Sequence, residues 1–460
     1  GHSNRVFLGT RLISRSAKQG AGTHVSGGGH RSHFIDLTPF RTSPAFARMW
    51  VGSAITGLGG QLTIVAVMLH VFALTGSTFA VAMVAVFGLV PMIFAGLYGG
   101  MLADAMDRRV VALVGACITW GSTIALATVA WMGIDVVWPL YLLTTINAAA
   151  NTIVGTARQA IVPRLLPREL LPAASALGGI SVGLMVTVGP ALAGVLVAST
   201  GFQWTYTIDA VLHIAAFLGL WTLPSILPEG ARHRPGLRSL ADGWNFLRVA
   251  PNIRLQFILD IVAMTFGQPL ALFPAIGVLI LGGGPITVGV LTASIAIGAL
   301  LSSLFSGRIG TVRRQGVGIE RAIMAYGVFI GLFGVVLLVA ALGWVSPGGV
   351  SETQPDLPLI AAACVFLAAA GAADNISSIF RNTMMQAAVP DDVRGRLQGI
   401  FVVVITGGPR LGALYAGALS SIAALWFPPL LGGIVIVGLC ALLVRLNPRF
   451  RLYDALDPVP

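Results

Sequence analysis

Long apolar runs alternate with short polar connections along most of the chain. About twelve of these runs are long enough to cross roughly 30 Å of hydrocarbon as helices. The pattern predicts an all-α membrane protein, because a helix satisfies its own backbone hydrogen bonds in lipid. The predicted spans are 45–73, 78–103, 110–132, 137–162, 170–199, 203–224, 253–281, 286–307, 319–343, 358–387, 395–423 and 425–446.

The composition supports a membrane protein and argues against other classes. Of the 460 residues, 56% are hydrophobic and only 10% are charged, whereas soluble domains carry roughly 25% charged residues. The net charge is +11, but the arginines form short clusters between apolar runs, which does not indicate a nucleic-acid partner. The three cysteines fit neither a disulfide frame nor a metal site. We therefore expect a lipid bilayer and a small-molecule substrate as partners, and no metal.

Positive charge alternates from one connection to the next. The connections near Thr75, Asp135, Gly201, Gly283, Glu352 and Phe427 contain neither Lys nor Arg. The intervening connections contain Arg108 and Arg109, Arg164 and Arg168, Arg232 and Arg238, Arg313 and Arg314, and Arg394 and Arg396. Because positive loops stay in the cytoplasm, both termini are predicted to be cytoplasmic, in the inner or plasma membrane.

The two halves of the chain share short sequences at matching positions. The fourth span ends in Gln159-Ala-Ile-Val-Pro163, and the tenth span ends in Gln386-Ala-Ala-Val-Pro390. Parallel repeats of this kind are typical of one transporter architecture.

The pattern predicts five regions. They are a disordered basic tail (1–40), a first six-helix bundle (41–224), a linker with an amphipathic helix (225–252), a second six-helix bundle (253–446) and a tail (447–460). The chain begins with Gly rather than Met, so its first residues are expected to be an added segment or a fragment edge.

The connection after the second span reads GGMLADAMDRR at residues 99–109. Gly100, Asp104, Arg108 and Arg109 match four positions of the G-x-x-x-D-[R/K]-x-G-[R/K]-[R/K] motif, and the stretch resembles that of the major facilitator superfamily. Ala105 and Asp107 depart from the motif. The passages TGS (75–77), ARQAIVPRLLPREL (157–170) and VPDDVRGRLQG (389–399) resemble the branch of the enterobactin exporter and related drug/proton antiporters.

This resemblance implies two pseudo-symmetric six-helix bundles and a cytoplasmic gate. In the superfamily, the residue that Asp104 matches contacts helix 11, and the contact closes the cytoplasmic side. With a base missing at position 105, Asp107 is an alternative partner that holds Arg108 in place. A topology signal with a tight turn explains the same stretch without a gate.

A second motif lies in the fifth span. Gly189, Pro190 and Gly194 resemble part of the G-P-x-x-G-G motif of exporters, with Ala193 in place of one Gly. Small residues let helices approach closely, and Pro removes one backbone hydrogen bond. Generic Gly-rich packing is the alternative.

Ionisable side chains inside the predicted spans are candidate functional residues, because burying them is costly. Asp374 and Arg410 fall near the middle of their spans at about 1.5 Å per residue, and they are able to form an ion pair. Arg381 lies two turns beyond Asp374 on the same face. The hypothesis is a site for protons or a cationic substrate; the alternative is a fixed structural ion pair.

Other polar groups lie deep in the spans. Asp209, followed one turn later by His213, is either part of a proton relay or an acid that reaches the membrane surface. Asp260 is a candidate for the lining of the cavity. Gln61, Asn147 and Asn151 bind the substrate or form hydrogen bonds between helices.

The sequence predicts a transporter rather than an enzyme, because it contains no phosphate-binding loop and no H-E-x-x-H motif. The predicted function is secondary active, proton-coupled efflux of amphipathic small molecules, either drugs or a siderophore, by alternating access. A proton gradient replaces any cofactor, and the chain is expected to be monomeric. An importer or lipid transporter on the same fold, or a channel or sensor, remains an alternative.

Overall fold

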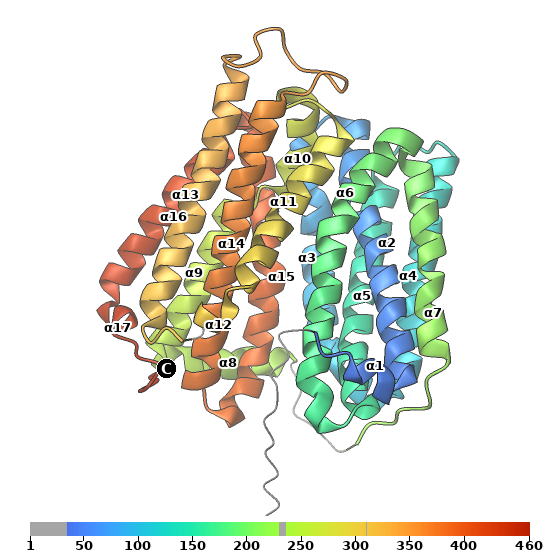
Figure 1. Cartoon of the computed structure of the whole chain (residues 1–460), viewed down its shortest axis with the longest axis vertical. Coiled ribbons are helices and arrows are strands. Elements are labelled where there is room, and N and C mark those ends of the chain that lie inside the picture. Colours follow the sequence, from blue (N-terminus) through green and yellow to red (C-terminus); the bar gives the residue numbers. More distant parts are fainter. Residues whose placement is uncertain (1–34, 230–235, 310) are drawn as a thin grey trace, which may run out of the picture. The chain divides into compact units, whose positions relative to one another are not determined.

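Helices make up nearly all of the described chain in this computed structural model, which covers residues 35–229, 236–309 and 311–460 (Figure 1). The side chains of Asp104, Arg396 and Gln398 lie outside that description. The helices up to the middle of the chain are α1 (Thr38–Thr42), α2 (Pro44–Thr75), α3 (Thr78–Ala105), α4 (Arg108–Trp131), α5 (Trp138–Leu165), α6 (Leu171–Leu212), α7 (Ile214–Trp221) and α8 (Leu237–Val249). Those that follow are α9 (Pro251–Gly267), α10 (Phe273–Ala275), α11 (Pro285–Ser303), α12 (Ser306–Ile309), α13 (Gln315–Ala341), α14 (Leu357–Ala388), α15 (Asp391–Ile422), α16 (Phe427–Leu446) and α17 (Pro448–Arg451).

The long helices begin and end close to the predicted boundaries, for local reasons. Ser43 caps α2 by accepting a 3.2 Å hydrogen bond from the Phe46 N–H, and Pro44 suits the first helical position because it lacks an N–H. Gly76 ends α2 in the left-handed region, with φ of 62°, where a glycine carries no Cβ penalty.

Two predicted spans are interrupted inside. α6 continues through the predicted break between the fifth and sixth spans, but Gly201 has φ of 85° and ψ of 178°, which is not helical. The seventh span is α9, a 3₁₀ turn at Leu270–Leu272, α10 and a π turn at Ile276–Ile280. Pro269 and Pro274 lack backbone donors, so a regular helix cannot continue through them.

Ten helical segments of the described chain are long and apolar enough to cross a membrane. One of them, Arg168–Trp221, includes both α6 and α7. α5 is not among the ten because its Asn, Thr, Gln and Arg side chains lower its hydropathy. The chain is therefore a multi-pass helical membrane protein, and the predicted all-α class is confirmed.

The linker and the tails differ from the membrane spans. Most of the predicted basic tail, residues 1–34, lies outside the described residues, and helix begins at Thr38 rather than after residue 40. In the linker, α8 packs against α9 and α15 and buries Leu247, while Leu237 and Trp244 are exposed. Such an apolar exposed face on a helix beside charged residues suits a membrane surface.

The core of the unit Leu37–Pro460 consists of three clusters of buried apolar side chains. The first cluster joins both halves of the chain at the helix ends next to the Arg-free connections, and it includes Phe72, Val81, Phe273, Val288 and Ala416. The other two lie at the Arg-rich ends. One contains side chains of the first half, such as Phe46 and Leu166, and the other contains side chains of the second half, such as Ile253 and Val444.

Helices of the two halves meet mainly along two pairs, α6 with α11 and α3 with α15 (Figure 1). Near the Arg-free end of the second pair, Thr78 Oγ1 lies 2.6 Å from Ser420 Oγ. The halves are thus packed together at the Arg-free end, whereas at the Arg-rich end each half keeps its own core.

This packing predicts a disulfide between T78C and S420C in a background in which the three native cysteines are replaced by Ala. The two hydroxyl oxygens are so close that two sulfur atoms at these positions can bond with little backbone movement. A protease site inserted between residues 229 and 236 allows the two halves to be separated by cleavage, so that a gel shows whether a disulfide still joins them. After oxidation and cleavage, the double variant should run as one band and each single variant as two. Two bands from the oxidised double variant would contradict the packing.

Candidate functional site

A cavity of about 790 Å³ lies among α2, α4, α5, α6 and α7. Two predicted site residues, Gln61 and Asn151, line it, and Trp50, Val154 and Met185 supply apolar wall. The cavity extends to Phe46 and Leu171, which lie at the Arg-rich ends of α2 and α6. A mostly apolar cavity with a few polar groups is the usual form of a small-molecule site.

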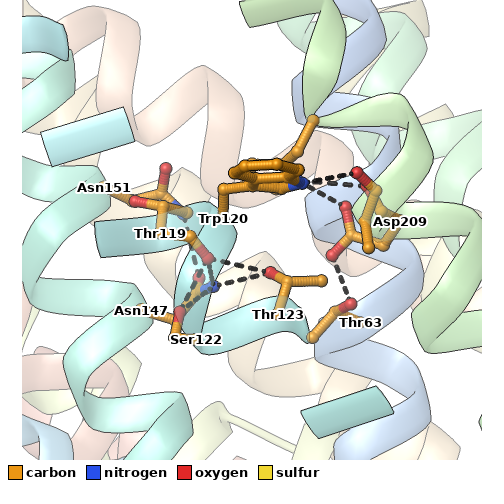
Figure 2. Close-up of polar contacts among 10 residues, drawn as sticks. Thr63, Thr119, Trp120, Ser122, Thr123, Asn147, Asn151 and Asp209 are labelled. Atoms are coloured by element: carbon orange, nitrogen blue, oxygen red, sulfur yellow. Dashed lines mark hydrogen bonds and ion pairs between the residues drawn. The ribbon is translucent and has the colours of Figure 1, made fainter. Parts of the chain in front are cut away.

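The polar face of α5 divides its two asparagines between structural and cavity roles. Asn147 lies in α5, and its Nδ2 donates to three oxygens of α4 (Figure 2). These are the Thr119 carbonyl at 3.3 Å, Ser122 Oγ at 3.0 Å and Thr123 Oγ1 at 3.2 Å. Asn151 Nδ2 donates to Asn147 Oδ1 at 3.0 Å. Asn147 therefore joins two helices, while Asn151 is held with its side chain on the cavity wall.

Asp209 is completely buried and lies at the centre of a hydrogen-bonded network, so the idea that it reaches the membrane surface is wrong. Its Oδ1 lies 2.7 Å from Nδ1 of His213. Its Oδ2 accepts a hydrogen bond from Thr63 of α2 (Figure 2). His213 also lines the cavity, where its Nε2 has no partner among the described residues. The network thus connects the cavity to a buried carboxylate.

In the second half, Arg381 of α14 lies between two carboxylates. It forms an ion pair with Asp260 of α9, and its Nη2 lies 3.8 Å from Asp374 Oδ1. The predicted pair between Asp374 and Arg410 is wrong: within the described residues, no ion pair joins them. Arg381 lies on the same face of α14 as Asp374, so its guanidinium is close to that carboxylate. Arg410 lies on α15, and its guanidinium contacts Met92 of α3 instead.

Arg410 belongs to the contact between the two halves. Its Nη1 donates to the Thr406 carbonyl at 3.0 Å and its Nη2 contacts Met92 Sδ of α3. A Cβ on Gly88 of the same helix would lie 3.7 Å from Arg410 Nε. The guanidinium therefore lies against the α3 surface.

Next to Asp374, Asn375 repeats the arrangement seen at Asn147. Its Nδ2 donates to the Ala299 carbonyl at 3.1 Å, Ser302 Oγ at 2.7 Å and Ser303 Oγ at 3.0 Å. These oxygens belong to the end of α11, so the amide joins α14 to α11. This interhelical hydrogen bond was not predicted, although an Asn beside an intramembrane Asp is a signal for one.

The hairpin at 99–109 is anchored within the first half. Asp107 caps α4 through the Arg109 N–H at 3.0 Å and accepts from the Ile226 N–H at 3.0 Å and the Ser225 hydroxyl. Partial burial raises the pKa of Asp107, but the hydrogen bonds from Ser225, Ile226 and Arg109 outweigh it and hold the pKa below the usual value. Asp107 thus fixes the start of the linker, a role that the prediction of a contact with Arg108 did not include.

The two arginines of the hairpin also bind backbone. Arg108 is buried, and its Nη1 donates to the Ala160 carbonyl of α5 at 2.9 Å. Arg109 Nη2 donates to the Trp221 carbonyl at 2.8 Å, at the end of α7. Gly100 is buried at the end of α3. The side chain of Asp104 is outside the described part of the chain, so its predicted contact with helix 11 stays a prediction.

The glycines of the α6 motif permit close helix contacts. A Cβ on Gly189 would lie 2.5 Å from Gln61 Cβ of α2, and one on Gly194 would lie 2.5 Å from the Pro285 carbonyl oxygen of α11. Pro190 lies inside α6, and its carbonyl faces Gly289 of α11. The motif therefore packs α6 against a neighbour in its own half and against one in the other half.

One cavity residue was missed by the sequence analysis. Arg158 of α5 lies on the cavity wall, within the predicted span 137–162. An arginine inside a predicted span is itself a signal of function. In the stretch ARQAIVPRLLPREL, Arg164 and Arg168 were interpreted as cytoplasmic charges and Arg158 was not singled out.

Known proteins are similar in sequence to nearly the whole chain. The enterobactin exporter EntS of Citrobacter koseri is 27% identical over 440 residues, which is 94% of this chain and 98% of the relative. The corresponding protein of Salmonella typhi is 27% identical over 417 residues, covering 90% and 95%.

Solved structures show the fold at lower identity. An auto-inhibited peptide transporter of the POT family aligns with a TM-score of 0.69 at 11% identity, over 90% of this chain and 99% of that one. A bacterial homologue of the iron transporter ferroportin, in an inward-facing state, aligns with a TM-score of 0.61 at 13% identity, over 89% and 98%.

The helical fold and its relatives define a membrane transporter. Residues 35–460 match the family model described as transmembrane secretion effector, and the chain belongs to this family. The resemblance to the major facilitator superfamily that the hairpin indicated is thereby confirmed.

The buried network predicts that Asp209→Ala lowers stability by about 1–3 kcal/mol, because His213 and Thr63 lose their acceptor in a buried site. Asp209→Asn should cost less, since it keeps an oxygen acceptor. Thermal unfolding of detergent-purified protein measures both. Asp242→Ala on the exposed face of α8 is the control and should leave the melting temperature unchanged. Equal melting temperatures for Asp209→Ala and wild type would show that the network does not stabilise the fold.

Proposed function

We propose that the protein is a secondary active exporter that moves amphipathic small molecules out of the cytoplasm by alternating access. The observation that carries this proposal is the unequal packing of the two halves. They share one apolar cluster at the Arg-free end and have separate cores at the Arg-rich end. A transporter that is closed on the outside and open to the cytoplasm has this arrangement, because positive connections face the cytoplasm.

The proposed topology has twelve crossings in two bundles of six. Counting α5 as a crossing and separating Arg168–Trp221 at Gly201 raises the ten apolar segments to twelve. Helices α2–α7 then form the first bundle, and α9–α16 form the second. In this topology both termini are cytoplasmic, the membrane is the inner or plasma membrane, and α8 lies on its cytoplasmic face.

The cavity favours a drug-sized substrate with both apolar and polar parts. Its volume of about 790 Å³ falls within the roughly 300–1,000 Å³ typical of small-molecule sites. The similar proteins named as enterobactin exporters support outward transport and place a siderophore among the candidate substrates.

The proposed energy source is the proton gradient, and no cofactor is needed. The proposed transporting unit is a monomer. Arg381 binds Asp260 closely and Asp374 more loosely, and the exposed side-chain fraction is 38% for Asp374 but 18% for Asp260. Asp374 is therefore the carboxylate that is free to gain and lose a proton, while Asp260 holds Arg381 in place. The Asp209–His213 pair is a second candidate path from the cavity.

Export predicts lower accumulation of substrate in cells that contain the protein. A screen of dyes, antibiotics and siderophores in cells with and without the protein measures this directly. Higher accumulation would identify an importer. In proteoliposomes, exchange of labelled for unlabelled substrate should occur, because a carrier binds one solute at a time. Flux without exchange would identify a channel and contradict the proposal.

Asp374→Asn should abolish efflux driven by a pH gradient but leave substrate exchange at equal pH intact, because only the proton-binding group is removed. The measurement is transport into proteoliposomes with and without an imposed gradient. Asp391→Asn, at an exposed carboxylate that pairs with Arg394, is the matched control and should behave as wild type. Full gradient-driven efflux by Asp374→Asn would remove this residue from the coupling mechanism.

A further inference from the structure

Arg158 differs from the other arginines near it because its side chain has no partner in the part of the chain that the structure describes. Arg164, further along α5, forms a 3.1 Å ion pair with Glu229 and donates to the Leu227 carbonyl. Arg108 donates to the Ala160 carbonyl of the same helix. Arg158 forms neither an ion pair nor a hydrogen bond with any described residue, and its Nε is shielded from solvent. It lies about 10 Å along the helix from Leu165, within a predicted membrane span.

The charge of Arg158 is also uncompensated by the rest of the cavity. Among the described residues that line the cavity, none is Asp or Glu. An arginine inside a membrane protein is normally paired or hydrogen-bonded, since burial of an unpaired charge is costly. The cavity therefore presents a positive group that requires an external anion.

Two further polar atoms of residues that line the cavity have no hydrogen-bond partner among the described residues. They are Thr56 Oγ1 of α2 and Nε2 of His213. Gln61 and Asn151 add amide groups to the wall, whereas Trp50 and Met185 add apolar surface. Trp50 is held in place because its indole N–H donates to the Leu177 carbonyl at 3.1 Å. One side of a ligand can thus form hydrogen bonds while the other packs against an aromatic ring.

We propose that Arg158 binds the anionic group of the transported molecule, and that this cavity takes amphipathic organic anions. The planar guanidinium suits an oxyanion such as a carboxylate, phosphate or ionised phenol, to which it can donate two parallel hydrogen bonds. The amides of Gln61 and Asn151 bind the other polar groups of the ligand, and Trp50 packs against its ring or chain. This assignment rests on the proposed export function, since it makes the cavity the transport site.

The test compares two dyes with a related ring system and opposite charge, fluorescein and rhodamine 123. Fluorescence anisotropy measures their binding to the full chain in phosphatidylcholine nanodiscs. Arg158→Gln should weaken fluorescein binding by about 10- to 100-fold, as expected for loss of a charge-assisted hydrogen-bonded pair. Arg158→Lys should retain part of the affinity, and rhodamine binding should not weaken. Arg164→Gln is the matched control on the same helix and should leave both dyes unaffected.

Three results would overturn the inference. Fluorescein binding that is unchanged in Arg158→Gln would exclude a role in anion binding, and equal loss of both dyes would show that Arg158 only supports the structure. If phosphatidylglycerol in the nanodiscs removes the Arg158-dependent binding of fluorescein, the anion at Arg158 is a lipid headgroup rather than a substrate.

The accumulation screen separates this inference from the proposed function. Cells with Arg158→Gln should lose the exclusion of anionic compounds that the wild-type protein excludes. If wild type exports nothing, the proposed function fails, even where Arg158-dependent dye binding is present. If wild type exports anionic compounds and Arg158→Gln exports them equally well, the inference about Arg158 alone fails.

Discussion

The cost of placing polar groups in a membrane interior governs this structure. The backbone lowers this cost by forming helices, in which its N–H and C=O groups are hydrogen-bonded. Many polar side chains lower it by forming hydrogen bonds or ion pairs with neighbouring helices. Asn147 and Asn375 each bind three oxygens on the adjacent helix. Asp209 is held by His213 and Thr63, and Asp260 by Arg381. Arg158 lies on a cavity wall and forms no ion pair or hydrogen bond with any described residue, so a bound anion is the partner proposed for it.

Close contact between the two halves depends on small residues at the Arg-free end. Gly194 and Gly289 bring α6 and α11 together so closely that a Cβ on either one would lie 2.5 Å from a backbone oxygen of the other helix. Apolar side chains of both halves then form one cluster at that end. No such shared cluster occurs at the Arg-rich end within the described residues. The two halves are therefore packed together more extensively at the Arg-free end than at the Arg-rich end.

The hairpin at 99–109 resembles a superfamily motif and also forms contacts within the first half of the chain. Its arginines bind the carbonyls of Ala160 and Trp221, and Asp107 binds the first residues of the linker. These contacts tie the α3–α4 turn to the ends of α5 and α7, so the turn moves with its own half. Asp107 stands where the motif has Gly, and it anchors the first residues of the linker.

Apolar run lengths were sufficient to predict the helical class and most helix ends, because hydrophobic length and helix-ending residues act locally along the chain, while the hairpin at 99–109 indicated the superfamily. The sequence also identified Gln61, Asn151, Asp209, Asp260 and Asp374 as polar groups within the predicted spans. The pairing of those groups could not be predicted: Asp374 neighbours Arg381 and not Arg410, and Asp209 is buried rather than at the membrane surface. Partner choice depends on helix rotation and on contacts between segments far apart in sequence. Only the tertiary structure decides these, and for the same reason it alone shows Arg158 facing the cavity without a counter-charge.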